Sequence, residues 1–374
     1  MKICYFGTYR KEYSRNTIMI AALEDAGIEV EQCHVTLWHS IQDRIETTTG
    51  GWKRPSFWWR AFQAYFKLII RFIKVRDFDI LMVGYPGQFD IFLAKFFALL
   101  RGKPLVWDVF MSIYLIAKER GLDLQDNSTV KLIRWIESRA LRIPDMLIQD
   151  TDTYVHWFHE EYGISPERFR LVPTGADDRI FTPKVVSRID NKSLVLYYGT
   201  FIPNHGVLKI MEAANFLRNE KDILFEFIGD GPDKAQAESF SIDHELENVR
   251  FLAWMSQEEL LNHIAGADIC LGAFGKTPQS LMTIQNKIYE CMAMGKPVIT
   301  GESPAVRAGL PSDTVVLCSR DDPQDIASAI LKLKQDPARQ NILSENAGSV
   351  FREHFSIASL GQRMAAYFSA LVNK

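Results

Sequence analysis

The segment QNKIYECMAMGKPVIT, residues 285–300, carries the most informative pattern in the chain. Glu290 follows Lys287 by three residues and Asn286 by four, so on a helix these side chains project from one face. Glycine and proline at positions 295 and 297 then end the helix, and an apolar run follows. The segment therefore predicts a helix with a polar, chargeable face, followed by a buried strand.

The alternation of helix and strand continues outward from this segment. Short apolar runs separated by stretches of helical periodicity are typical of parallel sheets covered on both faces. The first series is KICYF, IEVEQCHV, DILMVGY, KPLVWDVF, DMLIQD and FRLVP, and the second is SLVLYYG, ILFEFIG, NVRFLAW, ADICLGAF, KPVITG and TVVLCS. Helices of the first series are expected near residues 14–26, 57–75, 89–101, 128–142 and 151–161. The sequence predicts an α/β chain with two doubly wound, Rossmann-like domains.

The segment PTGADDRIFTP, residues 173–183, interrupts this alternation with proline, glycine and charge. We place the domain boundary there, with a first domain at 1–175 and a second at 176–354. Ligands of open parallel sheets bind outside the carboxyl ends of the strands. A ligand site in the cleft between two facing sheets is therefore expected.

Composition excludes several classes of protein. The 374 residues suffice for about two domains, and 47% hydrophobic with 24% charged residues is typical of a soluble globular chain. A net charge of −3 argues against a wholly basic nucleic-acid binder. The five cysteines form no CxxC pair, which favours buried reduced thiols over disulfides or metal. With no signal peptide and no apolar run of about 18 residues, a cytoplasmic location is expected.

Three loops of the second domain have the chemistry to bind an anion. In YYGTFIPNHG, Gly199 and Gly206 allow close backbone approach ahead of a helix. In FIGDGPDK, the turn at Gly231 is as compatible with a structural turn as with a ligand contact. In the third loop Lys287 joins a helix N-terminus, although it could equally be a solvated lysine paired with Glu290. Parallel strands end at one edge, so the three loops are expected to share one ligand.

The motifs YYGTFIPNHGV, FEFIGDGP, NVRFLAWMSQEEL, ADICLGAF and NKIYECMAMGKPVI resemble those of the GT-B glycosyltransferases, specifically the retaining family numbered four. The resemblance is sharpest over residues 194–310 and covers nearly the whole chain in element order. It implies that the second domain binds a UDP- or GDP-linked sugar and that the first binds the acceptor. It also implies that a final helix, at about 355–374, crosses back to the first domain.

The resemblance implies roles for individual residues of the second domain. Glu290 matches the second glutamate of the family's E-x7-E motif, which holds the ribose hydroxyls of the nucleotide. Trp254 and Met255 close the segment that holds the base. The first glutamate of the motif falls at Met282, where this chain departs from the family.

In the first domain, Gly7 resembles the glycine loop that approaches the donor diphosphate, with Arg10 or Arg15 as the accompanying charge. Asp108 stands where the family often presents a polar side chain to the donor sugar. Its alternative role is that of a strand-end aspartate capping a loop.

Two further departures concern the diphosphate. The arginine expected after Gly199 is Thr200, and the lysine expected before Gly206 is His205. Lys287, Asn286 and His205 are the predicted replacements, because a leaving diphosphate needs fixed donors within hydrogen-bond reach.

The implied reaction is transfer of a sugar to an acceptor hydroxyl with retained anomeric configuration, without a metal ion or another cofactor. Asp150-Thr151-Asp152 is interpreted as a helix cap instead of a metal-binding DxD motif. The predicted catalytic residues are Asp108, Lys287 and Glu290. The predicted donor-binding residues are Gly7, Arg15, Gly199, Thr200, His205, Gly231, Trp254, Met255, Asn286, Ile288 and Glu290.

Residues 52–76, WKRPSFWWRAFQAYFKLIIRFIKVR, contain seven lysines and arginines and no acidic residue. A helix of this composition suits an anionic membrane surface, which favours a lipid-linked or glycan acceptor. The predicted membrane contacts are Trp52, Trp58, Trp59, Arg60 and Lys67. A domain helix with a solvated basic edge is the main alternative, and nucleic-acid binding is disfavoured because the basic residues follow helical spacing.

The sequence therefore predicts a glycosyltransferase of bacterial surface polysaccharide or glycolipid synthesis, peripheral on the inner face of the plasma membrane. A nucleotide-sugar epimerase or phosphorylase on the same fold is one alternative, and a phosphorylase would need a pyridoxal site for which the chain has no extra segment. A non-catalytic nucleotide-sugar-binding protein is another.

Overall fold

A computed structural model of the chain describes residues 1–37, 54–186, 188 and 192–373. The chain divides into two compact units, which are described separately. Unit 1 comprises Met1–Pro173 and Ile357–Lys374, and unit 2 comprises Thr174–Ser356. Each unit contains a six-stranded sheet in which every neighbouring pair of strands is parallel. The predicted α/β fold with two doubly wound sheets is confirmed.

The sheet of unit 1 has the strand order β2-β1-β3-β4-β5-β6. Its strands are β1 (Lys2–Gly7), β2 (Glu29–His34), β3 (Ile80–Val83), β4 (Leu105–Asp108), β5 (Met146–Gln149) and β6 (Phe169–Leu171). All residues of the central strands β3 and β4 are buried, as expected for strands with helices on both faces. Ile3 of β1 lies opposite Val30 on one side and Ile80 on the other. All six strands coincide with the predicted apolar runs.

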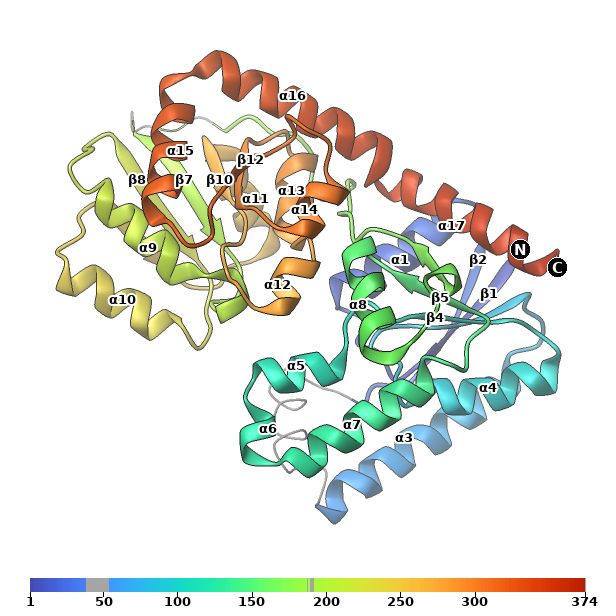
Figure 1. The fold of residues 1–374 in the computed structure, drawn as a ribbon. Helices are drawn as coiled ribbons and strands as arrows, with labels where there is room; N and C mark the ends of the chain where they lie inside the picture. The colour runs from blue at the N-terminus through green and yellow to red at the C-terminus, as the bar shows by residue number, and fades with distance from the viewer. Residues whose placement is uncertain (38–53, 187, 189–191, 374) are drawn as a thin grey trace. The chain divides into compact units, whose positions relative to one another are not determined.

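Eight α-helices of the described residues belong to unit 1. They are α1 (Ser14–Asp25), α3 (Pro55–Lys74), α4 (Asp90–Arg101), α5 (Ile113–Glu119), α6 (Leu122–Gln125), α7 (Asn127–Ala140), α8 (Asp152–Tyr162) and α17 (Ile357–Val372), with the short 3-10 helix η2 (Pro166–Arg168). The C-terminal helix α17 packs along α1 (Figure 1). Gly361 allows this contact, because a Cβ there would lie 2.1 Å from the Ala22 carbonyl oxygen. None of the helices in the described ranges is long and apolar enough to cross a membrane.

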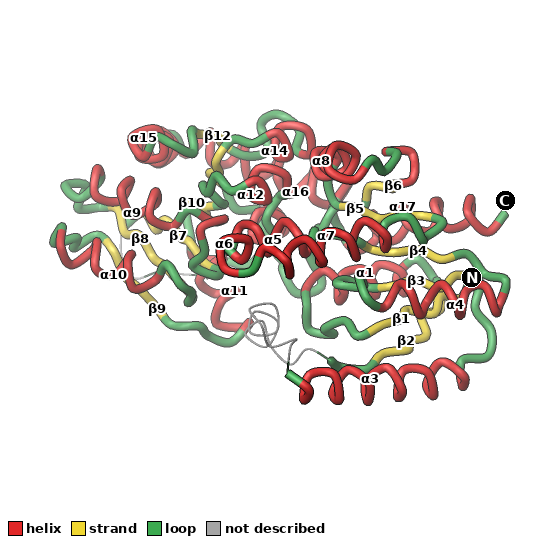
Figure 2. The backbone as a smooth tube through the Cα atoms, turned by 60° about the horizontal axis from the view of Figure 1, so that its bottom comes forward, coloured by secondary structure: helices red, strands yellow, loops and turns green. Residues whose placement is uncertain are grey.

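The sheet of unit 2 has the order β12-β11-β10-β7-β8-β9. Its strands are β7 (Ser193–Tyr198), β8 (Ile223–Ile228), β9 (Val249–Leu252), β10 (Ile269–Leu271), β11 (Val298–Gly301) and β12 (Val316–Cys318). Its helices are η3 (Pro203–His205), α9 (Val207–Phe216), α10 (Lys234–Asp243), α11 (Gln257–Gly266), α12 (Pro278–Met282), α13 (Asn286–Ala293), α14 (Pro304–Gly309), α15 (Pro323–Gln335) and α16 (Pro337–His354). Figure 2 shows the same elements coloured by type.

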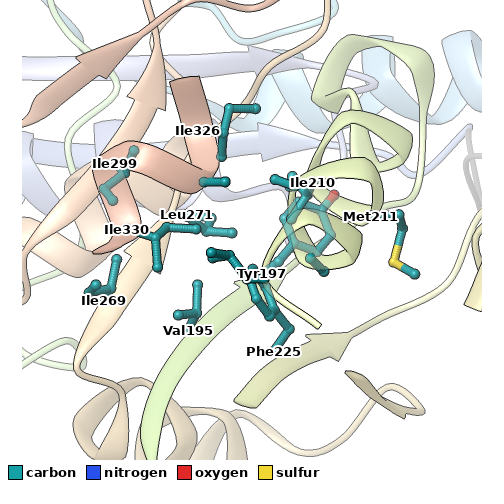
Figure 3. Packing of buried hydrophobic residues seen from close by; sticks show 14 of the residues in the cluster. Val195, Tyr197, Ile210, Met211, Phe225, Ile269, Leu271, Ile299, Ile326 and Ile330 are labelled. Atoms are coloured by element: carbon teal, nitrogen blue, oxygen red, sulfur yellow. The ribbon is translucent and has the colours of Figure 1, made fainter. Parts of the chain in front are cut away.

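One apolar core of unit 2 lies between its sheet and the helices α9 and α15. Val195, Ile269 and Ile299 come from three neighbouring strands, and Ile210 and Ile330 face them from the two helices (Figure 3). These side chains are fully buried, so the relative positions of the strand ends are fixed by close packing. All five cysteines of the chain are buried free thiols.

Candidate functional site

The candidate site lies in unit 2, where the strand order reverses direction. The chain passes from β7 to β8 and β9 on one side, and β10 lies on the other side of β7. In parallel sheets such a switch point is where the loops at the carboxyl ends diverge and leave room for a ligand. The two loops that flank it follow β7 and β10. The second of these leads into the short helix α12, which is followed by α13, the helix of the segment 285–300.

Hydrogen bonds join the loops after β7 and β10. The Phe274 amide donates to the His205 carbonyl at 2.9 Å, and the Ser280 hydroxyl donates to the Asn204 carbonyl at 2.6 Å. A Cβ on Gly206 would lie 2.5 Å from the carbonyl carbon of Phe274, and the backbone there has a φ of 63°. Glycine is required at this position both for space and for conformation.

Lys287 projects from the first turn of α13 into the site. Its side chain is 5% exposed, and its Nζ lies 3.9 Å from the centre of the Tyr197 ring and 3.5 Å from His205 Nδ1. No carboxylate of the described residues forms an ion pair with it. Burial lowers the pKa of Lys287 from 10.5 to about 7. The solvated-lysine alternative is thus wrong, because the Lys287 side chain is buried.

Three glycines follow β7 and β8, and each lies where a Cβ would have a close neighbour: Gly199, Gly229 and Gly231. A Cβ on Gly199 would lie 3.1 Å from Lys287 Nζ, so glycine leaves the ammonium accessible at that point. A Cβ on Gly229 would lie 2.1 Å from the Gly199 carbonyl oxygen, and one on Gly231 would lie 2.5 Å from the Phe201 carbonyl oxygen. Close packing against the Phe201 backbone therefore requires glycine at position 231, independently of any ligand contact.

His205 is held in one orientation by the loop after β7. Its Nδ1 lies 2.7 Å from the Thr200 carbonyl oxygen, which also accepts a hydrogen bond from the Tyr197 hydroxyl at 3.0 Å. Because a carbonyl only accepts, this contact favours the tautomer with the proton on Nδ1, while the Tyr197 hydroxyl lies 3.0 Å from the same nitrogen. Burial and the neighbouring Lys287 ammonium hold the pKa of His205 well below its usual range, so the ring is neutral. Thr200 acts here through its backbone.

Glu290 lies one helical turn beyond Lys287 on α13. Its Oε2 accepts a hydrogen bond from the Tyr198 hydroxyl at 2.7 Å, and burial raises its pKa. Lys287 and Glu290 thus lie on one face of α13, as predicted, although they do not pair directly. Each meets a different tyrosine at the end of β7, Tyr197 or Tyr198.

The N-terminus of α13 supplies a second attraction for an anion. Gln285 occupies the N-cap position, but its side chain makes no capping hydrogen bond to the helix. The partial positive charge of this helix end therefore lies beside the Lys287 ammonium. Asn286, the first residue of the helix, is half-buried.

The other predicted donor-binding residues of unit 2 lie around this centre in different environments. Ile288 is fully buried in the core, so its side chain packs against the sheet. Trp254 is 53% exposed and Met255 is half-buried, both just after β9. Their contact with a ligand stays a prediction.

Arg15 and Asp108 of unit 1 form a fully buried ion pair. Arg15 Nε donates to Asp108 Oδ2 at 2.9 Å and Nη2 donates to Oδ1 at 2.8 Å, while Nη1 donates to the carbonyls of Val172 and Pro173. Neither side chain has exposed surface. The pair ties the end of β4 to the segment after β6. A contact of either residue with a donor stays a prediction.

Gly7 forms a tight turn at the end of β1. Its φ is 139°, and a Cβ would lie 2.6 Å from Asp90 Oδ2. The same carboxylate accepts a hydrogen bond from the Thr8 amide at 2.7 Å and from the Tyr65 hydroxyl at 2.8 Å. The loop after β1 is therefore anchored to α4 and, through Tyr65, to α3.

Helix α3 contacts its unit through small and apolar side chains and leaves a second apolar face exposed. Its buried residues are Ala61, Ala64, Leu68 and Phe72. Trp59, Phe62, Phe66, Ile70 and Ile73, here called the α3 stripe, recur at intervals of three or four residues and are between 42% and 68% exposed. Within the stripe, Phe62 stacks between Trp59 and Phe66.

The remaining predicted membrane contacts flank this stripe. Trp58 is 59% exposed, Lys67 is exposed and Arg60 is half-buried. Trp52 lies outside the described residues. The helix therefore has the packed face of an ordinary domain helix together with an aromatic face that the described residues of its unit leave exposed.

Three site residues were missed by the sequence interpretation: Tyr197, Tyr198 and Arg320. The tyrosines lie in the run SLVLYYG, where they were indistinguishable from core aromatics. Arg320 follows the last strand in a charged loop, and only the fold reveals that its side chain is buried. Within residues 1–37, 54–186, 188 and 192–373, no group of three His, Cys, Asp or Glu side chains is arranged to hold a metal ion.

Comparisons with known proteins agree with this geometry. Residues 192–336 match the family model described as "Glycosyl transferases group 1". An alpha-D-kanosaminyltransferase of Streptomyces kanamyceticus is 24% identical over 279 residues, which cover 71% of this chain and 70% of that protein. A GDP-mannose-dependent monoacylated alpha-(1-6)-phosphatidylinositol monomannoside mannosyltransferase of Corynebacterium glutamicum is 22% identical over 236 residues, 59% of this chain and 61% of that protein.

Among solved structures, HepE of Anabaena in complex with UDP aligns over 99% of this chain and 100% of its own, with 14% identity and a TM-score of 0.71. This likeness concerns the fold. The family match falls within unit 2 and includes the loops after β7, β8 and β10. Residues 192–336 match the group 1 glycosyltransferases, and the fold of the chain is GT-B.

Proposed function

We propose that the chain transfers a sugar from a nucleoside diphosphate sugar to an acceptor hydroxyl with retention of anomeric configuration. The observation that carries the proposal is the buried Lys287 ammonium, unpaired with any carboxylate of the described residues, at the N-terminus of α13. A charge buried without a counterion is costly unless a ligand supplies one. The names of the relatives support a nucleotide sugar as that ligand.

In this proposal, different residues of unit 2 bind different parts of the donor. Lys287 and the α13 N-terminus neutralise the diphosphate, and Gly199 lets it approach the ammonium. Glu290, oriented by Tyr198, accepts hydrogen bonds from the ribose hydroxyls. His205 is neutral beside the Lys287 ammonium and gains a proton more readily once a dianion lies nearby.

The same groups stabilise the transition state. Negative charge grows on the leaving diphosphate as the glycosidic bond breaks, and fixed cationic groups favour that charge more than the ground state. We propose that these groups replace a required metal ion, and that no other cofactor takes part. Activity is therefore expected to persist in excess EDTA.

We propose a lipid-linked or glycan acceptor, bound by unit 1, with α3 resting on an anionic membrane from the cytoplasmic side. The α3 stripe would enter the head-group region while Lys67 and Lys74 meet lipid phosphates, each contributing roughly 1 kcal/mol. The lipid substrate named for the Corynebacterium relative supports this choice.

Release of free nucleoside diphosphate tests the proposed reaction. Wild-type protein is incubated with UDP- and GDP-sugars and a crude lipid acceptor, and the anomeric configuration of the product is read by NMR. Release with an axial-to-axial or equatorial-to-equatorial product supports the proposal, and Lys287→Ala should reduce release at least 100-fold. Release with inverted configuration would contradict retention.

A non-catalytic nucleotide-sugar-binding protein is the second candidate, and Met282 favours it. This residue is buried where the family presents its first glutamate to the donor sugar, so a thioether replaces a carboxylate. Tight binding of a nucleotide sugar without diphosphate release, across all donors and acceptors, would establish this second function.

Vesicle flotation tests the membrane contact. Wild-type protein should float with vesicles containing about 30% anionic lipid and not with neutral ones, and Phe62→Ser with Phe66→Ser should abolish flotation. The matched control is Ile242→Ser, an apolar residue of α10 that is 75% exposed. Equal flotation of both variants would rule out the α3 stripe as the contact.

A further inference from the structure

Arg320 follows β12 and connects two segments at the carboxyl edge of the unit 2 sheet. Its Nε donates to the Glu302 carbonyl at 2.6 Å and its Nη2 donates to the Gly301 carbonyl at 2.9 Å. Its Nη1 donates to the Gly275 carbonyl at 2.5 Å and to the Ser280 hydroxyl at 3.0 Å. The guanidinium therefore holds the loop after β10 against the end of β11.

All four acceptors are uncharged, which makes this arrangement unusual. Arg320 is 6% exposed, and no carboxylate of the described residues pairs with it. Burial lowers its pKa to about 10, so the guanidinium still carries its charge at neutral pH. Burying a cation without a counterion is unfavourable, and a fold that needed only to fill this space could use an apolar side chain.

A continuous path of hydrogen bonds leads from Arg320 to the Lys287 site. Ser280 accepts from Arg320 and donates to the Asn204 carbonyl at 2.6 Å, in the turn that carries His205. The same turn and the loop after β10 touch directly, since a Cβ on Gly275 would lie 2.1 Å from the Pro203 carbonyl oxygen. Any shift of this loop would therefore move the His205 turn.

We propose that Arg320 is a positioning residue for the diphosphate site. Through Ser280 it fixes the turn Pro203–His205, which in turn encloses the Lys287 ammonium. The inference rests on the proposed function, because it assigns Arg320 to the binding of the nucleoside diphosphate.

The shape of the side chain is essential to this role. A guanidinium directs N–H groups along three different lines in one plane and so reaches three separate carbonyls and a hydroxyl. A lysine ammonium at this position keeps the charge but cannot reach all four acceptors together. Arg320→Lys therefore separates charge from geometry.

The test measures UDP and GDP binding by calorimetry between pH 6 and 9, together with thermal unfolding. Ser280→Ala removes the hydroxyl that joins Arg320 to the His205 turn, and with it two hydrogen bonds, and should weaken nucleotide binding roughly three- to tenfold. Arg320→Lys should weaken it at least tenfold. The control is Arg307→Gln, an exposed arginine of α14 paired with Glu302, which should bind as wild type.

The pH profile separates positioning from general stability. Loosening the His205 turn admits water to Lys287, so in both variants the pH at which nucleotide affinity declines should move upward, towards the ordinary lysine pKa. If both variants bind nucleotide with wild-type affinity and a wild-type pH profile, the positioning role of Arg320 is wrong, while the proposed function still stands. Affinity that falls only in proportion to lost folding stability would also overturn the positioning role. Absence of nucleotide binding in the wild type would instead refute the proposed function, and this inference with it.

Discussion

Replacing Lys287 with methionine should stabilise the protein while abolishing nucleotide binding. The pKa of Lys287 is lowered from 10.5 to about 7, which corresponds to a cost of about 5 kcal/mol for holding the charged form in the folded state. Methionine fills similar space and keeps an apolar contact with the Tyr197 ring. After the loss of a cation–π contact of about 2 kcal/mol, a net gain of about 3 kcal/mol remains.

The stability gained by Lys287→Met must decrease as the pH rises. Because the folded pKa of Lys287 lies below its ordinary value, the unfolded chain binds more protons between about pH 7 and 10.5. Wild-type stability therefore rises with pH across this window, and the cost falls from about 5 kcal/mol below pH 7 to about 2 kcal/mol at pH 9. The advantage of Lys287→Met should shrink accordingly.

Thermal unfolding with and without UDP or GDP provides the assay. At pH 6.5 the variant should unfold at least 4 °C above wild type, since 1 kcal/mol shifts the melting temperature by about 2–4 °C in a unit of this size. Added nucleotide should raise the melting temperature of wild type only. The control is Lys332→Met, an exposed lysine of α15. A variant that is less stable than wild type yet still responds to nucleotide would refute the reasoning, because Lys287 would then be a structural residue.

Three further predictions follow from the contacts of single residues. Gly199→Ala should weaken nucleotide binding at least tenfold in calorimetry. The new Cβ would lie 3.1 Å from Lys287 Nζ, and the backbone φ of 131° is unfavourable for alanine. Unchanged affinity would show that the diphosphate does not bind next to Gly199. Glu290→Gln should remove any preference for UDP over 2′,3′-dideoxy-UDP, and a preserved preference would place the ribose elsewhere. Asp108→Asn should lower the free energy of unfolding by about 3–5 kcal/mol in urea titrations, since it leaves Arg15 buried and uncompensated; unchanged stability with lost turnover would instead support contact with the donor.

The fold could be predicted from the sequence because its strands are buried on both faces. Such strands appear as continuous apolar runs, and all twelve runs became strands in the predicted order. The meeting of Gly199, His205 and Lys287 was also predictable, since loops after parallel strands must lie at one edge of their sheet.

The polar partners inside the units could not be predicted. Arg15 and Asp108 are 93 positions apart and pair only because the fold brings the start of α1 to the end of β4, so each residue alone was compatible with a ligand role. Arg320 binds mainly backbone carbonyls, which every residue has and which leave no signature in a sequence. The exposure of the α3 stripe likewise depends on which helix face the sheet covers, and α3 has two apolar faces to choose from.

A crystal structure of the chain with UDP or GDP tests the central claim most directly. The account predicts a diphosphate oxygen within about 3.2 Å of Lys287 Nζ, beside the N-terminus of α13, with the ribose hydroxyls at Glu290. A nucleotide bound elsewhere, with the Lys287 ammonium still packed on Tyr197 and without an anion, would contradict it.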